Sequence, residues 1–366
     1  MSKTILVIFG GASNENEISV ITGTMAANVL KSGGDTVLPV YISQNGDIYA
    51  DEQLAEVSNF KGKKYLSAPR AVIADGGAYI LTKRGKIKRH IKADVALNCC
   101  HGGDGEGGAV SGLCAVAKIP LASAGIFESA VFMDKYLTKL ILSPLGIKTA
   151  EYKYVTNAEQ LNCPRNMPDF PVIVKPVSLG SSIGVQKAET REQLVEAVET
   201  ALLYDSAVIV EKYFENRREI NCAAYFADGA VITGECEEAF SNGDLLSFED
   251  KYMGGGRSVL PADIPADISD LIKNITEKVY STLNMRGVVR FDFILCGNDV
   301  YLSEVNTVPG SLSYYILSKG FKDFYKVLSA VIAQAQSDFN AKHAKKLLTT
   351  GILENIPANA CKLGKK

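Results

Sequence analysis

Short apolar runs alternate with longer segments of helical periodicity along the first 125 residues. Thr4–Phe9 is a continuous apolar and β-branched run that stops at a pair of glycines, which predicts a buried parallel strand. Glu17–Leu30 then carries apolar residues at helical spacing and ends before Gly33-Gly34. This alternation favours an α/β layer built on a parallel sheet. Later strands of this unit are expected at 36–42, 94–97 and 119–122, and later helices at 52–60 and 108–117.

Two more units of mixed helices and strands are expected, at residues 126–213 and 214–336. The patterns predict helices at 133–142, 191–204 and 267–283, and strands at 171–176, 207–214, 220–226, 231–235, 287–295 and 299–305. Residues 241–257 are polar and rich in glycine, without an apolar pattern. Residues 337–366 carry six lysines and are predicted to form a basic tail, for which a solvated helix with a frayed end is favoured over a docking segment.

Charge and composition narrow the classes of function. The 366 residues include 39 Lys and Arg against 41 Asp and Glu, so the net charge of -2 offers no overall basic field for nucleic acid or an anionic membrane. No stretch of about 18 apolar residues could span a bilayer. The eight cysteines include no C-x-x-C pair, and three histidines are too few for a His-rich metal site. We therefore expect a reduced cytoplasmic protein whose charged ligands meet a local site.

Polar and apolar residues alternate on two consecutive predicted strands. Arg290 and Asp292 are two positions apart and share one face of the first strand, and Glu304 and Asn306 do the same on the next. If the strands are hairpin neighbours, an Asp, a Glu and an Asn converge, and such oxygen ligands suit Mg²⁺. Two half-exposed strands with polar residues facing water would give the same pattern, so the pattern alone leaves both interpretations open.

Three glycine-rich loops follow predicted strands. The segment 174–184 leaves its strand at Lys175 and continues with Gly and Ser, a composition whose backbone N–H groups and ammonium can hold phosphates. The segment 101–108 lies where binding crevices form, at the carboxyl end of a parallel strand. The glycines at 10–17 do not match the dinucleotide fingerprint, which makes a reductase a remote alternative. Each loop by itself is a weak signal.

Seven motifs, each weak by itself, form a specific signature when they occur together in this order. They read GGASNENEIS at 10–19, HGGDGEGGAVSG at 101–112, MDKYLTK at 133–139, VKPVSLGSSIG at 174–184, Lys251-Tyr252, RFD at 290–292 and EVNTVPG at 304–310. Over residues 3–335 the sequence resembles the D-alanine–D-alanine ligase family of the ATP-grasp superfamily. The resemblance implies an ATP-grasp fold of three α/β domains: an N-terminal substrate-binding domain with a parallel sheet, and two subdomains that hold ATP between them.

The resemblance also implies roles for single residues. Those expected to bind ATP are Lys135, Lys175, Glu211, Lys212, Tyr213, Glu219 and Lys251. Asp292, Glu304 and Asn306 would bind two Mg²⁺ ions, with Mn²⁺ as a substitute, and residues 241–257 would form a lid loop. The implied catalytic residues are Glu15, Ser181, Tyr252, Arg290 and Gly310, and the implied substrate contacts are Glu15, His101, Ser313 and Tyr315.

The implied reaction has two steps. The carboxylate of a first D-alanine attacks the γ-phosphate of ATP to give an acyl phosphate, and the amine of a second D-alanine then displaces phosphate. Arg290 and the backbone N–H of Gly310 would stabilise the oxyanion. Glu15 would pair with the first ammonium, in a triad with Ser181 and Tyr252. D-alanyl-D-alanine made in this way serves peptidoglycan precursor synthesis, and a homodimer is the assembly that the family implies.

The sequence also departs from the family pattern. Family members usually read Gly-Glu-Asp-Gly where residues 105–108 are GEGG, and Gln in place of Ser111. They carry a Thr-Ser pair and small polar residues where residues 311–315 are SLSYY, so Tyr315 would reshape the pocket of the second amino acid. Two alternatives therefore stay open: a sister ligase that joins another second amino acid such as D-serine, and a non-catalytic nucleotide-binding paralogue.

Overall fold

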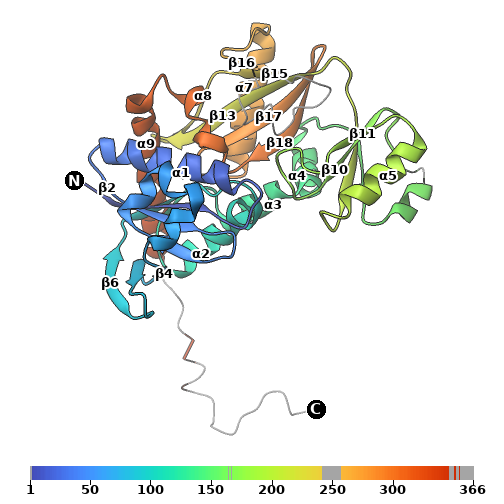
Figure 1. The fold of residues 1–366 in the computed structure, drawn as a ribbon. Coiled ribbons are helices and arrows are strands. Elements are labelled where there is room, and N and C mark those ends of the chain that lie inside the picture. The colour runs from blue at the N-terminus through green and yellow to red at the C-terminus, as the bar shows by residue number, and fades with distance from the viewer. Residues whose placement is uncertain are drawn as a thin grey trace.

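The computed structural model describes residues 2–163, 165, 167–240, 257–345, 350, 351 and 354. Within this part of the chain, three larger sheets and one small sheet are present, and helices cover the larger sheets (Figure 1).

A five-stranded sheet of order β3-β2-β1-β7-β8 forms the base of the first unit. Its strands are β1 (Thr4–Gly10), β2 (Thr36–Ile42), β3 (Ile48–Ala50), β7 (Val95–Asn98) and β8 (Leu121–Ala122). All run parallel except β3. Alternate residues of β1 pack on opposite faces, towards α1 (Asn16–Ser32) on one side and α2 (Val110–Val116) on the other. Burial on both faces explains why β1 is a continuous apolar run, and the predicted parallel sheet is confirmed.

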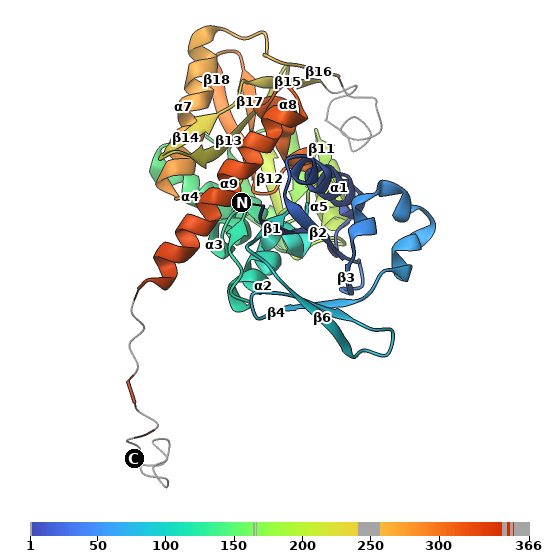
Figure 2. The ribbon, with the colours of Figure 1, turned by 90° about the vertical axis from the view of Figure 1, so that its left-hand side faces the viewer.

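A small antiparallel sheet was missing from the sequence prediction. It consists of β4 (Ala71–Ala74), β5 (Gly77–Leu81) and β6 (Ile87–Lys92), and it extends away from the body of the molecule (Figure 2). Because β6 is exposed along almost its whole length, it has no buried apolar face that could have revealed it. The helix expected at 52–60 is instead a series of short 3₁₀ turns, namely η1 (Glu52–Ala55), η2 (Val57–Asn59) and η3 (Lys61–Ser67).

The middle unit is an antiparallel sheet of order β11-β10-β12-β9, against which α5 packs. Its elements are β9 (Tyr152–Val155), η6 (Ala158–Asn162), β10 (Val172–Pro176), β11 (Gln186–Ala188), α5 (Arg191–Ala201) and β12 (Val208–Lys212). The helix expected at 133–142 is α4 (Lys135–Leu142), followed by η5 (Ser143–Leu145), and a separate helix α3 (Ile126–Met133), which was not predicted, precedes it. The break falls at Asp134, whose backbone is extended and whose carboxylate accepts the N–H of Leu137 as an N-cap.

The third sheet has the order β16-β15-β13-β17-β18, with β14 beside β13. Its strands are β13 (Arg218–Ala227), β14 (Ala230–Thr233), β15 (Glu237–Phe240), β16 (Arg257–Val259), β17 (Val289–Cys296) and β18 (Asp299–Asn306). The amphipathic helix α7 (Ala266–Thr282) buries its apolar side in the core of this sheet. The expected hairpin of β17 and β18 is confirmed, whereas β15 and β16 were not predicted.

The chain after β18 returns to the first unit. It continues through η7 (Gly310–Ser313) and α8 (Tyr314–Leu317) into α9 (Phe321–His343), whose apolar residues share the core of β1 and α1. Residues 337–343, expected within the tail, are thus the last turns of α9. The division at residues 125, 213 and 336 stays a prediction. In the part of the chain that the structure describes, no helix is long and apolar enough to cross a membrane.

Candidate active site

A cleft of about 640 Å³ lies between the middle sheet and the third sheet, with α1 and η7 along its rim. Most of the residues singled out in the sequence line this cleft. They are Lys135, Lys175, Ser181, Glu211, Lys212, Tyr213, Glu219, Arg290, Asp292, Glu304, Gly310 and Tyr315. A smaller adjoining cavity is lined by Glu15, His101 and Asn306 and shares Ser181, Arg290 and Glu304 with the cleft. One continuous region therefore gathers the predicted nucleotide and amino acid residues.

The nucleotide side of the cleft contains a buried carboxylate between two lysines. Glu211, on β12, pairs with Lys175 of the neighbouring β10 at 2.7 Å and with Lys139 of α4 at 2.8 Å. Burial would raise the pKa of Glu211, but Lys175 and Lys139 outweigh burial and lower it to about 2. Burial likewise would lower the pKa of Lys175, and Glu211 together with Glu304 raises it instead.

Lys139 was not among the predicted site residues. It lies one helical turn after Lys135, so the two lysines share a face of α4 and both point towards the strands. Lys135 donates to the carbonyl of Leu179 at 2.6 Å and lies 3.6 Å from Glu304. The motif MDKYLTK contained both lysines, and only the tertiary contact with Glu211 distinguishes the second.

The face of β17 and β18 carries the predicted metal ligands. Asp292 lies opposite Glu304 in the ladder, and Arg290 lies opposite Asn306. Arg290 binds both carboxylate oxygens of Asp292, at 2.7 and 2.9 Å, and the side-chain amide of Asn306 donates to Asp292 at 3.0 Å. The predicted convergence of these side chains on one face is therefore present.

This donor set fits a magnesium ion. Two carboxylates and an amide oxygen are hard ligands, and Mg²⁺ takes a few such ligands together with substrate phosphates. Among the described residues, no three His, Cys, Asp or Glu side chains gather as a metal site.

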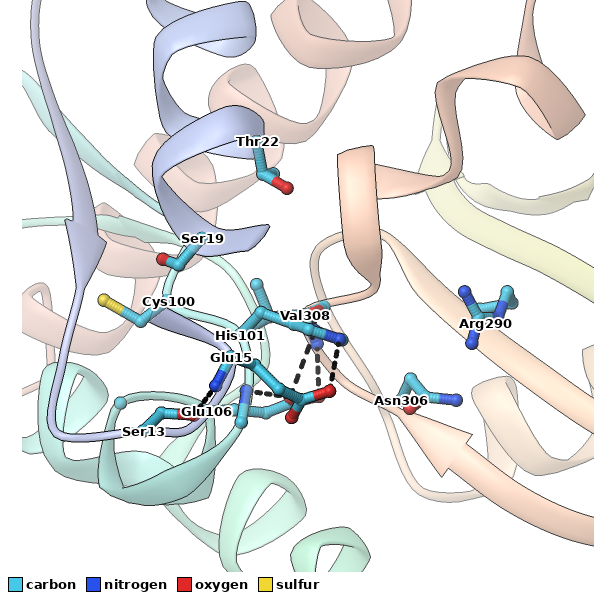
Figure 3. A network of polar contacts seen from close by, with 12 residues as sticks. Ser13, Glu15, Ser19, Thr22, Cys100, His101, Glu106, Arg290, Asn306 and Val308 are labelled. Carbon is cyan, nitrogen blue, oxygen red and sulfur yellow. Dashed lines mark hydrogen bonds and ion pairs between the residues drawn. The ribbon is translucent and has the colours of Figure 1, made fainter. Parts of the chain in front are cut away.

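A buried acidic group lies at the amino acid end (Figure 3). Glu15 precedes α1 and is 5% exposed; its carboxylate accepts the hydroxyl of Ser181 and lies 3.4 Å from the Nε2 atom of His101. Gly102 has a positive φ, and a Cβ atom there would lie 2.2 Å from Glu15. The glycine therefore provides the space that the carboxylate occupies.

Glu106 was not predicted as a functional residue, and it supports His101 from the other side. It accepts the backbone N–H groups of Gly102 and Val308 at 2.8 and 2.9 Å, while the Nδ1 atom of His101 contacts the Val308 carbonyl at 2.6 Å. Burial would lower the pKa of His101, but Glu15 and Glu106 outweigh it and raise the pKa to about 9. His101 is therefore held as a cation between two carboxylates.

The segment after Gly310 has an unusual backbone. Ser311, Leu312 and Ser313 have φ values of 51°, 45° and 48°, a left-handed region that side chains other than glycine rarely occupy. This turn brings Tyr315 into the cleft beside Arg290, and burial raises the pKa of Tyr315 to about 12 although Arg290 opposes the change. Ser313 is fully buried, its hydroxyl has no hydrogen-bond partner in the described structure, and it does not line the cleft.

Comparison with known proteins now decides the family. The family model described as D-ala D-ala ligase C-terminus matches residues 141–327, and the one described as D-ala D-ala ligase N-terminus matches residues 4–124. The D-alanine–D-alanine ligase of Thermosipho melanesiensis is 34% identical over 346 residues, which cover 92% of this chain and 94% of that protein. This chain belongs to the D-alanine–D-alanine ligase family.

Solved structures agree with this membership in the ligase family. The D-alanine–D-alanine ligase of Helicobacter pylori has a TM-score of 0.74 and 29% identity, covering 92% of this chain and 98% of that one. The VanG D-Ala:D-Ser ligase of Enterococcus faecalis has a TM-score of 0.75 at 24% identity, covering 93% of this chain and 100% of that one, and supports the fold alone. The predicted ATP-grasp fold is thereby confirmed.

The positions of the predicted site residues support some of the roles implied by the ligase family better than others. Lys251 and Tyr252, with most of the expected lid loop 241–257, lie outside the described residues. Glu219 lines the cleft and accepts from the Nε atom of Arg217 at 3.4 Å, and Arg217 in turn lies over the ring of Tyr213. The position of Ser313 away from the cleft lends no support to its role as a substrate contact. All these roles stay predictions.

Proposed function

We propose that this protein condenses two molecules of D-alanine to D-alanyl-D-alanine, with cleavage of ATP to ADP and phosphate, for peptidoglycan precursor synthesis. The observation that carries the proposal is that a cleft for a nucleotide and a pocket for an amino acid adjoin each other. A cleft lined by lysines and arginines suits a triphosphate, and it opens onto a buried carboxylate that suits an ammonium group.

The buried group at Glu15 would hold the first D-alanine. Its carboxylate is 5% exposed and would pair with the substrate ammonium, while Ser181 fixes the orientation of the carboxylate. The cationic His101 balances one of the nearby negative charges, so the pocket stays compatible with a zwitterion. Held in this way, the substrate carboxylate would face the cleft, where Lys135 and Arg290 lie.

The cleft would hold ATP. Lys135 and Lys175 are the cations for its phosphates, and the strand end at Glu211, Lys212 and Tyr213 would contact the adenine. Asp292, Glu304 and Asn306 would hold Mg²⁺. When bound, this ion would neutralise negative charge on the phosphate oxygens as the γ-phosphoryl group is transferred.

Transfer of the γ-phosphoryl group to the substrate carboxylate would give an acyl phosphate. The guanidinium of Arg290, which Asp292 holds at two points, and the backbone N–H of Gly310 would stabilise the oxyanion formed when the second amine attacks. Exclusion of water protects the acyl phosphate from hydrolysis, and the burial of Glu15, Ser181 and His101 is consistent with this requirement.

Mass spectrometry of the products tests the proposal. Purified protein is incubated with ATP, Mg²⁺ and an equimolar mixture of D-alanine, L-alanine, D-serine, glycine and D-lactate. We expect alanyl-alanine as the main product, and its disappearance when D-alanine is left out. Retention of ATP without any condensed product would support the non-catalytic paralogue instead.

A second candidate is the ligase that joins D-alanine to D-serine. It is favoured by Tyr315, which occupies the cleft where family members carry a small residue. The same mixture separates the two candidates, since a dominant alanyl-serine mass would keep the mechanism and change the acceptor.

Location and assembly are further parts of the proposal. We expect the protein in the cytoplasm, where ATP is available. We also expect a homodimer through the first 125 residues, and size-exclusion chromatography with light scattering would test for it.

A further inference from the structure

Two cysteines lie close together in the third sheet, Cys222 within β13 and Cys236 immediately before β15. β13 and β15 are antiparallel, with Ile220 opposite Glu238 and Asn221 opposite Glu237. The ladder ends at Asn221 and Glu237, and Cys222 and Cys236 are the next residues on the two sides, with Cys236 just before β15. Neighbouring antiparallel strands have opposed Cα atoms about 4.5–5.5 Å apart, and disulfide bonds join cysteines whose Cα atoms are about 4.4–6.8 Å apart, so residues just past the end of such a ladder are candidates for a bond.

Both thiols lie in the same apolar core. Cys222 is 0% exposed and Cys236 is 2% exposed, and the interaction between the two thiols, together with burial, raises the pKa of Cys222. Both are free cysteines in the structure. Neither has a role in the proposed ligase reaction, because they lie on the face of the sheet opposite to Asn221 and Glu237, which line the cleft.

The surroundings favour the thiolate form of one of them. Ser269 donates its hydroxyl to Cys236 at 3.6 Å, and Lys273, one turn later on α7, adds positive charge while pairing with Glu235 at 2.8 Å. Burial would raise the pKa of Cys236. The Cys222 thiol has the larger, opposite effect, and with Ser269 and Lys273 it lowers the pKa to about 7. A thiolate is the reactive form of cysteine towards peroxides.

From this placement we infer that Cys222 and Cys236 form a redox-sensitive dithiol, which a hydroperoxide converts to a cross-strand disulfide. The inference goes beyond the proposed function and does not depend on it. Hydrogen peroxide is little larger than water and reaches buried groups through local opening of the sheet edge.

The chemistry needs only the peroxide as oxidant. The Cys236 thiolate attacks one peroxide oxygen, the O–O bond breaks, and sulfenic acid and hydroxide are formed. The sulfur of Cys222 then attacks the sulfenic sulfur and displaces its oxygen as hydroxide, which takes up the thiol proton as water. In total, two thiols lose two electrons and two protons, and one peroxide becomes two waters.

The full-length protein is treated with hydrogen peroxide, blocked with an alkylating agent, digested without reductant and examined by mass spectrometry. We expect a peptide pair joined through Cys222 and Cys236 that separates on reduction. In the Cys222→Ser variant the cross-link should vanish and a sulfenic acid at Cys236 should be trapped by dimedone. Cys163→Ser, which removes an exposed cysteine, should leave the cross-link unchanged.

Two outcomes would overturn the inference. One is that both buried thiols stay alkylatable after unfolding, at a peroxide dose that fully oxidises Cys163. The other is that wild-type Cys236 proceeds to sulfinic acid without joining Cys222. Both are measured on the wild-type chain, so neither depends on a variant that folds. As a further check on the role of positive charge, Lys273→Met should slow formation of the cross-link.

Discussion

The nucleotide end of the active site is built on strands, whereas the amino acid end is built on loops. Lys175, Glu211, Asp292 and Glu304 are strand residues whose neighbours are set by ladder register. Glu15, His101 and Ser181 come from the segments that follow β1, β7 and β10, and Tyr315 comes from the short helix α8. Their contacts span up to 207 residues of sequence, between His101 and Val308.

This difference has a physical consequence for specificity. A ladder constrains every residue through its neighbours, so the phosphate and metal end tolerates little change in position. Loops can be altered without disturbing the sheets, and the left-handed turn at 311–313 lies in the segment predicted to meet the second amino acid. We therefore expect one end of the cleft to keep the chemistry constant and the other to select the amino acid.

The largest expected effect is on the ladder end. Asp292→Asn removes a carboxylate from the metal set and from both contacts with Arg290, so we expect kcat to fall by about 100-fold or more with the fold intact. Steady-state kinetics and circular dichroism measure the two quantities. Asp299→Asn is the matched control, since this exposed aspartate at the start of β18 pairs only with a surface lysine in the described structure. Wild-type activity in Asp292→Asn would refute the metal assignment.

The loop end should respond in substrate binding. Glu15→Gln removes the charge expected to pair with the first ammonium, and we expect KM for D-alanine to rise by about 10–100-fold, with little change in KM for ATP. Glu17→Gln, one exposed position inside α1, should leave both constants unchanged. If KM for ATP rose as much as KM for D-alanine, the separation of the two ends would be wrong.

Loss of a lysine partner should reduce the free energy of unfolding more at the buried carboxylate of Glu211 than at an ion pair on the surface. Lys139→Met leaves Glu211 with one of its two lysines, and we expect the free energy of unfolding to fall by about 2 kcal/mol in urea titrations. Lys148→Met, which breaks an exposed pair with Asp299, should cost much less, because water screens that pair. Equal losses in the two variants would contradict the importance of burial.

The same carboxylate predicts a pH dependence. Glu211 has a folded pKa of about 2, below the value of about 4.3 expected in the unfolded chain. Its contribution to stability is therefore present above about pH 4.3 and is lost as the pH falls towards 2. Between these values the wild-type protein should lose more stability than Lys139→Met, in which the pKa of Glu211 is shifted less.

The smallest expected effect concerns the acceptor. Tyr315→Ser opens the cleft beside Arg290, and we expect the second-site KM for the amino acid to change by about 10-fold, with a smaller change for ATP. Product ratios in the D-alanine and D-serine mixture should shift in the same variant. Parallel changes in both Michaelis constants would show that Tyr315 shapes the cleft as a whole.

Local periodicity was sufficient for the strand-built half of the site. The two-residue spacing of Arg290 and Asp292, with that of Glu304 and Asn306, already placed these side chains on one face, because strand geometry and a short turn leave few other arrangements. The order of the seven motifs carried the family and with it the ATP-grasp fold. No periodicity marked the exposed strand β6, since exposure removes the apolar alternation on which such predictions depend.

Contacts between distant segments were decided only by the tertiary structure. Glu106 binds the backbone of Val308, Lys139 binds Glu211, and α9 packs against β1, and none of these partners is close in sequence. The residue types alone permitted many pairings. Which of them formed was decided by the cost of burying a charge, which keeps a carboxylate in the core only where cations or backbone N–H groups from another segment meet it.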